Sequence, residues 1–182
     1  MFAGKIKWIT RLFVLFVITG FGLQPSFAKA SDGPELPPQC SSIQVEEGNK
    51  PAFHVYARGV QIYRWNGQSW DFVAPRATLY AEDQYFGEVG THYAGPKWES
   101  KSGSIVEGRR VQGTGCTPDP SAIAWLLLSK YDTSGAGIFA SVTFVQRVNT
   151  TGGLTPTDFG TFVGEVKEVP YTAEYYFYKA AN

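Results

Sequence analysis

Apolar and polar residues alternate along most of this chain in short runs, and no run has the spacing of an amphipathic helix of ten or more residues. The longest alternating run covers residues 138–148 and is rich in β-branched and aromatic side chains. Gly, Pro and Asn-Gly turn signals separate the shorter runs. Because period-two alternation belongs to half-buried strands, the pattern predicts an all-β, single-domain fold, an antiparallel β-sandwich or barrel.

The shorter runs complete the expected set of strands. Residues 53–57 and 60–65 alternate on either side of Arg58-Gly59, which we expect to join them, and Asn66-Gly67 predicts a hairpin. Residues 123–128 are continuously apolar, which fits a strand buried on both faces or one to two helical turns. Further strands are expected at residues 70–73, 77–81, 85–89, 104–107 and 173–178.

The first thirty residues have the features of a targeting segment. Basic residues precede an apolar run over residues 12–23, and Ala28 and Ala30 fit the small-residue positions of a signal peptidase site. The run is shorter than the roughly 20 residues of a membrane span, although an uncleaved anchor is the alternative. We expect a secreted or periplasmic protein, cut after Ala30, with no membrane attachment after cleavage. The expected organisation is a signal peptide (1–30), an extended Pro-containing N-terminal lead-in (31–50) and an all-β domain (51–182).

Charge and cysteine content narrow the classes of partner and compartment. Four of the 16 basic residues lie in the leader, so 12 remain against 16 acidic residues. Without a basic stripe, this surface argues against binding nucleic acid or anionic membranes. In an oxidising compartment, Cys40 and Cys116 are expected to form a disulfide that stabilises the fold by roughly 4 kcal/mol, although their loops alone do not set their distance.

One block of residues is the candidate site. We expect Trp98 to offer an apolar face, while His92 and Glu99 offer hydrogen bonds or acid–base chemistry; Gln61 and Asp71 complete the set if neighbouring strands bring them close. Sugar rings bind to such pairings of aromatic and polar groups. The alternative is structural, with a turn at Gly95-Pro96 and Trp98 packed beneath it.

Known chemical motifs are scarce. The two histidines have no His-x-His or Cys/His spacing, so we predict no metal site. Residues 135–140 fit G-x-G-x-x-A, but they precede the best strand instead of a helix, which indicates glycines in a turn and no dinucleotide cofactor. His54, Trp125 and the aromatic run 175–178 are expected to serve the strands and core.

Five ordered blocks of sequence resemble a known family. They read GVQIY to ATLY (59–80), HYAGPKWE (92–99), AWLLL (124–128), QRVNTTGGLTP (146–156) and PYTAEYYFY (170–178). In that order they resemble the domain-of-unknown-function family numbered 3455, secreted proteins with no established activity. The resemblance implies two family cysteines where this chain has Trp65 and residues 157–159. Cys40 and Cys116 would then form a disulfide separate from the one that the family's cysteines would form.

Three hypotheses about function follow. The first is a non-catalytic binding or interaction module for carbohydrate or a cell-surface polymer, based on export, aromatic content and the lack of a catalytic motif. The second is a hydrolase or lyase that uses His92 and Glu99. The third is a structural envelope protein, for which we expect no pocket.

Overall fold

The computed structural model describes Met1 and residues 33–181; apart from Met1, the predicted signal peptide and its cleavage site lie outside these residues. Within them the chain forms one short 3-10 helix and eight strands that close into an antiparallel barrel in sequence order. This confirms the all-β prediction and selects the barrel. The elements are η1 (Pro38–Ile43), β1 (Asn49–Trp65), β2 (Trp70–Tyr80), β3 (Glu88–Tyr93), β4 (Lys97–Ser100), β5 (Ile105–Arg110), β6 (Leu126–Ser134), β7 (Val142–Gly152) and β8 (Val166–Ala180).

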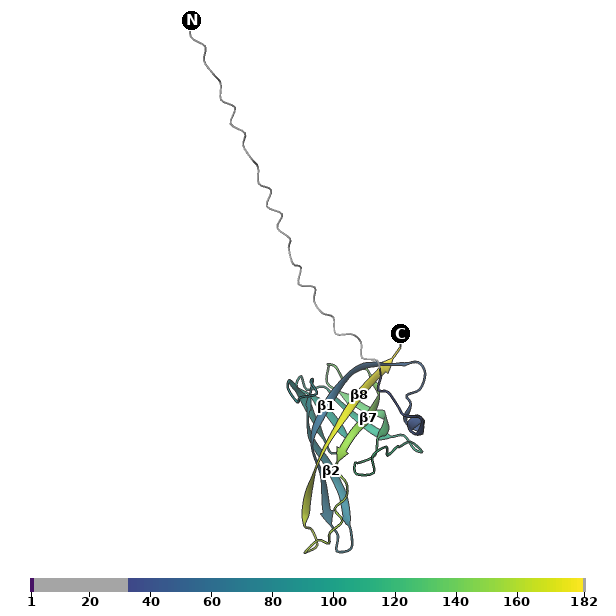
Figure 1. Ribbon diagram of the computed structural model, residues 1–182, viewed down its shortest axis with the longest axis vertical. Coiled ribbons are helices and arrows are strands. Elements are labelled where there is room, and N and C mark those ends of the chain that lie inside the picture. The colour runs from purple at the N-terminus through teal and green to yellow at the C-terminus, as the bar shows by residue number, and fades with distance from the viewer. Residues whose placement is uncertain (2–32, 182) are drawn as a thin grey trace.

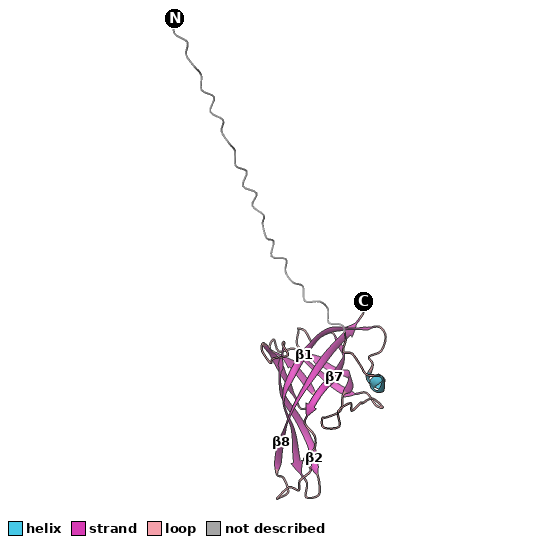
Figure 2. Ribbon diagram, viewed as in Figure 1, coloured by secondary structure: helices cyan, strands magenta, loops and turns pink. Residues whose placement is uncertain are grey.

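The strands differ greatly in length, and this gives the barrel its shape. β1 and β8 have 17 and 15 residues, whereas β4 has four. β1 pairs with both β2 and β8, and these three strands run past the others as an extension (Figure 1). Figure 2 shows that the only helix in the described part of the chain is the turn of η1 beside the barrel. The extension therefore projects beyond this end of the barrel on one side only.

Aromatic and aliphatic side chains fill the barrel around Trp98 and the inward face of β8. Phe177 stacks on Phe53 with ring centroids 4.7 Å apart, and Phe139 lies 4.9 Å away, so rings close the end opposite the extension. Burying rings of this size is the main driving force available to a small β core. The buried interior set is Val55, Ala57, Ala77, Leu79, Trp98, Val106, Leu128, Phe139, Val142, Val145, Tyr171, Ala173, Tyr175 and Phe177.

Several sequence expectations about strand boundaries were wrong. Residues 70–73 and 77–81 belong to one strand, β2, and the run 85–89 becomes strand only from Glu88. Arg58-Gly59 is not a turn but lies inside β1, where a Cβ at Gly59 would stand 2.5 Å from the Ala77 Cα of β2. Here glycine permits close approach of two strands. The run over 138–148 becomes strand only from Val142, because Gly135 and Gly137, both at positive φ, turn the chain between β6 and β7. The prediction of a glycine turn there is confirmed.

Other local predictions were correct. The Asn66 side-chain oxygen accepts hydrogen bonds from the backbone N–H groups of Gln68 and Ser69, closing the β1–β2 hairpin. In the apolar run 123–128, Leu128 faces the interior while Leu127 is buried on the outside of the barrel. The run is thus buried on both faces, although β6 begins only at Leu126.

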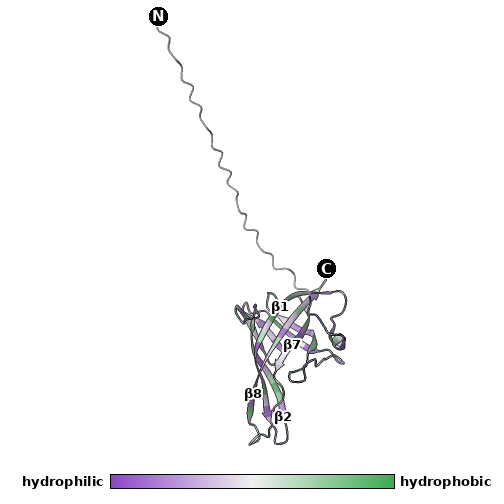
Figure 3. Ribbon diagram, in the orientation of Figure 1, coloured by the Kyte–Doolittle hydropathy of each residue, from purple (hydrophilic) through white to green (hydrophobic). Residues whose placement is uncertain are grey.

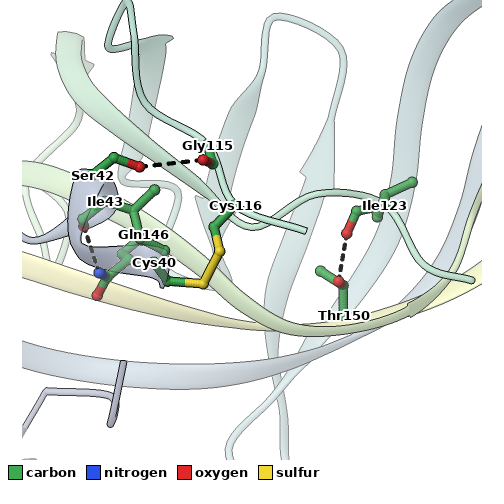
Figure 4. The surroundings of a disulfide bond; sticks show 8 residues. All are labelled: Cys40, Ser42, Ile43, Gly115, Cys116, Ile123, Gln146 and Thr150. Carbon is green, nitrogen blue, oxygen red and sulfur yellow. Dashed lines mark hydrogen bonds between the residues drawn. A yellow bond between two sulfur atoms is a disulfide. The ribbon is translucent and has the colours of Figure 1, made fainter. Parts of the chain in front are cut away.

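The reason Leu127 is covered is the segment that precedes the barrel. Pro38–Ile43 of the expected lead-in forms η1 instead of a wholly extended chain, and it packs against the outer faces of β6, β7 and β8. Cys40 and Cys116 form the predicted disulfide, with Cα atoms 5.2 Å apart (Figure 4). The buried Gln146 amide donates to the Ile43 carbonyl over 2.8 Å and anchors η1 beside this bond.

The extension has its own small core. Trp65 and Trp70 pack with ring centroids 5.4 Å apart, and the Trp70 indole donates to the Asp158 carbonyl over 2.8 Å. Trp65 also contacts Phe159 edge to face at 6.0 Å. The two places where the resemblance implies cysteines are therefore neighbours in space, joined here by an aromatic contact. Hydrophobic residues recur along β2 and β8 in this region (Figure 3).

Candidate functional site

A cavity of about 350 Å³ opens at the end of the barrel beside the extension. Antiparallel pairing brings the end of β5 and the start of β6 to this end, together with the β3–β4 turn. A more open hollow of about 530 Å³, which shares Arg110, Leu126 and Arg147 with the cavity, continues it toward Leu154 and Thr155. The cavity is lined by Gln61, Phe72, Val73, Pro75, His92, Gly95, Pro96, Trp98, Arg110, Leu126, Leu128, Arg147 and Tyr175.

Two arginines stand in the wall of this cavity, on either side of Leu126. The Arg147 guanidinium donates through Nε and Nη2 to the Ala124 carbonyl, at 3.1 and 2.7 Å. Arg110 binds the Thr114 carbonyl through the same two nitrogens, at 3.3 and 2.9 Å. Each planar guanidinium is held on one edge by a backbone oxygen, which leaves the other edge with N–H groups to donate.

His92 is fixed by stacking and by one hydrogen bond. Its ring lies parallel to that of Trp98, with centroids 4.5 Å apart and planes 9° apart. Burial lowers the pKa of His92 to about 3; the hydrogen bond to the Lys97 carbonyl opposes this, and the charge of Arg147 adds to it. The ring is neutral at pH 7, so Nδ1, 2.8 Å from the Lys97 oxygen, carries the proton and Nε2 is left as an acceptor.

Several buried polar atoms in and below the cavity have no hydrogen-bond partner among the described residues. They include Gln61 Nε2, Trp98 Nε1 and the hydroxyl oxygens of Tyr171 and Tyr175. Leaving a buried donor or acceptor unpaired costs about 1–3 kcal/mol, and few are tolerated in a folded protein. Burial also raises the pKa of Tyr175, although the Arg147 charge opposes the rise, so this hydroxyl stays protonated. Three of these four residues line the cavity.

The structure brings together some of the predicted site residues and separates others. His92, Trp98 and Gln61 line the cavity together. Glu99 follows Trp98 on β4 and points to the other face of the sheet, where its carboxylate accepts a hydrogen bond from the Tyr93 hydroxyl over 2.9 Å. Asp71 lies in the β1–β2 hairpin and accepts from the Asn66 amide at 3.0 Å.

The remaining predicted side chains serve packing. His54 stacks on Tyr176 at 4.5 Å outside the cavity, and burial lowers its pKa against the opposing charge of Glu174. Trp125 packs against the covered outer cluster under η1. These placements agree with the expectation that both residues serve the strands and core.

Sequence reasoning missed both arginines. A signal was present for Arg147, because it falls on the same face as Val145 in the strongest strand pattern, where a charge has no structural reason to be. Arg110 carries no such signal, since it follows Arg109 at the end of a strand and only the barrel register shows which of the two faces inward.

Residues 33–181 contain neither a metal-binding cluster nor a membrane-spanning helix. No group of three or more His, Cys, Asp or Glu side chains in this part of the chain is arranged to hold a metal ion. None of the helical turns described is long and apolar enough to cross a bilayer.

Together these features define a class: a closed, eight-stranded antiparallel barrel with a small, cationic-walled cavity at one end. The chain belongs to the family described as Protein of unknown function (DUF3455), whose model matches residues 46–179. The match spans every strand of the barrel and confirms the resemblance seen in the sequence. No curated protein and no solved structure matches the chain.

Proposed function

We propose that this protein is an exported, non-catalytic binding module that takes a single small molecule into the open end of its barrel. The observation that carries the proposal is the coincidence of an apolar cavity of about 350 Å³ with buried polar groups that the chain does not pair. Ligand sites commonly have about 300–1,000 Å³, mostly apolar walls and a few placed polar groups. The Cys40–Cys116 disulfide supports export to an oxidising compartment.

The details of the cavity favour binding over hydrolysis. A general acid–base pair must reach the same substrate atoms, whereas His92 faces the cavity and Glu99 faces away from it. Among residues 33–181, no carboxylate lines the cavity. The hydrogen bond from His92 Nδ1 to Lys97 and the pKa of about 3 also suit a fixed acceptor better than a proton shuttle.

The packing of His92 on Trp98 argues against a carbohydrate polymer as the ligand. His92 covers one face of Trp98, and Trp98 is 1% exposed, so this indole offers no open platform for a polymer. A single small molecule, including a monosaccharide, fits the cavity better than a chain does. A purely structural envelope protein has no need of unpaired polar groups beside a cavity.

Binding of the neutral fluorescent probe N-phenyl-1-naphthylamine tests this proposal. Its emission rises in an apolar site, and we expect saturable binding of one probe per chain. Leu126→Trp places an indole at the mouth of the cavity and should abolish binding. Tyr131→Trp is the matched control, since it adds the same ring to the exposed surface of the same strand.

The two variants distinguish probe binding in the cavity from probe binding on the surface. Loss of probe binding in Leu126→Trp alone supports the cavity as the site. Equal binding by both variants would place the probe elsewhere, for example on the exposed Phe159 and Phe162, and would contradict the proposal. Retention on polysaccharide gels that Leu126→Trp leaves unchanged would instead favour a surface for polymers.

A further inference from the structure

We infer that the ligand of the cavity is a small organic carboxylate with an aromatic or branched apolar body, its carboxylate held by Arg147 and Arg110. This inference rests on the proposed binding function and names the chemical class of ligand. It follows from the charge of the cavity wall, from the hydrogen-bonding groups in it and from its size.

The wall of the cavity carries two positive charges. Both guanidinium groups are permanently cationic, and among the described residues neither forms an ion pair with a carboxylate. Elsewhere on the barrel, Arg76 is paired with Glu168 at 2.6 Å on the surface. Two unpaired cations beside apolar walls create a positive potential that a bound anion relieves.

The charge of Arg147 shifts the pKa values of groups inside the barrel. It contributes to the lowered pKa of His92 and opposes the rise of the Tyr175 pKa caused by burial. An anion placed beside Arg147 therefore gains attraction that a neutral ligand of the same shape lacks. The neutral His92 ring adds no competing positive charge deeper in the cavity.

The cavity contains several hydrogen-bond donors that lack a partner. Each arginine uses two N–H groups on a backbone carbonyl and has further N–H groups on its free edge. Gln61 Nε2 and Trp98 Nε1 are also unpaired donors. A carboxylate only accepts hydrogen bonds and fits the planar edge of a guanidinium through two oxygens. A donor-rich site of this kind matches a carboxylate and leaves a cation or a simple alcohol poorly paired.

The volume and the apolar wall of the cavity set the size of the ligand. A cavity of about 150 Å³ already holds benzene, so about 350 Å³ leaves room for one or two rings and a carboxylate. Leu128 and Pro75 provide the apolar wall for the body of the ligand, while the arginines stand on either side of Leu126 near the mouth. The cavity thus has one cationic and one apolar side.

The test compares two ligands of the same shape, 2-naphthoate and its neutral amide, 2-naphthamide. Each competes with N-phenyl-1-naphthylamine for the wild-type protein. Because charge-assisted hydrogen bonds are the stronger ones, we expect the acid to bind at least about 10-fold more tightly than the amide. Arg147→Gln should reduce this preference to about 2-fold or less.

Matched variants guard against a general loss of structure. Arg109→Gln is the control, because Arg109 faces outward with its guanidinium 4.0 Å from the centre of the Tyr131 ring. Arg110→Gln repeats the test at an exposed position whose removal leaves the interior packing intact. Circular dichroism checks that each variant keeps the β-sheet spectrum.

The possible results separate the two proposals. A preference for the acid that both Arg147 and Arg110 support and Arg109 does not affect establishes the inference. Equal affinity of acid and amide, or displacement of the probe by the amide alone, overturns the inference but keeps a binding cavity. Failure of the neutral probe itself to bind the wild-type cavity overturns the binding function and the inference with it.

Discussion

Replacing both cysteines of the Cys40–Cys116 disulfide by alanine should remove about 4.5 kcal/mol from the free energy of unfolding. The two cysteines are 76 residues apart, and the chain-entropy relation for a loop of that length gives this figure at 25 °C. The loss is a large part of the about 5–15 kcal/mol by which small domains are stable. The bond matters because it ties η1 and the long connection before β6 to the barrel.

Urea unfolding followed by tryptophan fluorescence measures the effect. The wild type in reductant and the double alanine variant should shift to lower urea by similar amounts, and reductant should change the variant no further. Gln146 keeps η1 attached through Ile43, so we expect the spectrum of the folded variant to match the wild type. A loss below about 1 kcal/mol would refute the reasoning, since the unfolded chain would then gain little freedom from reduction.

Three further predictions concern stability. Gly59→Ala places a Cβ against the backbone of β2, overlapping the Arg76 carbonyl oxygen, and should cost at least about 3 kcal/mol by thermal denaturation. Gln146→Leu removes the partner of the Ile43 carbonyl and should cost about 2–4 kcal/mol in urea, whereas a loss under about 0.5 kcal/mol would contradict the buried bond. Because the pKa of His92 is about 3 when folded and 6.5 when unfolded, only the unfolded histidine takes up a proton as pH falls below about 6.5, and stability is lost over that range. The wild type should therefore lose about 1.3 kcal/mol per pH unit more than His92→Gln between pH 6 and 4, and equal slopes would contradict the buried neutral ring.

The fold could largely be predicted from alternation because period-two patterns survive wherever a strand has one buried face. The glycine at position 59 misled the prediction, since glycine marks both turns and close strand approach, and only the partner strand distinguishes the two. The choice between sandwich and barrel depended on whether β1 pairs with β8, a contact between residues more than a hundred positions apart. No local pattern contains that information.

The candidate site was less accessible to prediction. Trp98 and His92 could be predicted because they stand in one block of aromatic and polar residues, whereas Gln61 was included only if neighbouring strands brought it close. Alternation then explains why Glu99 faces away from its neighbour Trp98. Arg110 reaches the cavity because it alternates along β5 with the buried residues Val106 and Gly108. The sequence does not show this, because Ile105 and Val106 are both apolar and either of them could face the interior.

The most direct measurement is a crystal structure of the protein soaked with 4-bromobenzoate, in which the anomalous signal of bromine locates the ligand. We expect one bromine peak inside the barrel, on the apolar side of the cavity, and carboxylate density within hydrogen-bond distance of Arg147. Density with the carboxylate turned away from both arginines, or a bromine peak only on the outer surface at saturating ligand, would contradict a cavity built for organic anions.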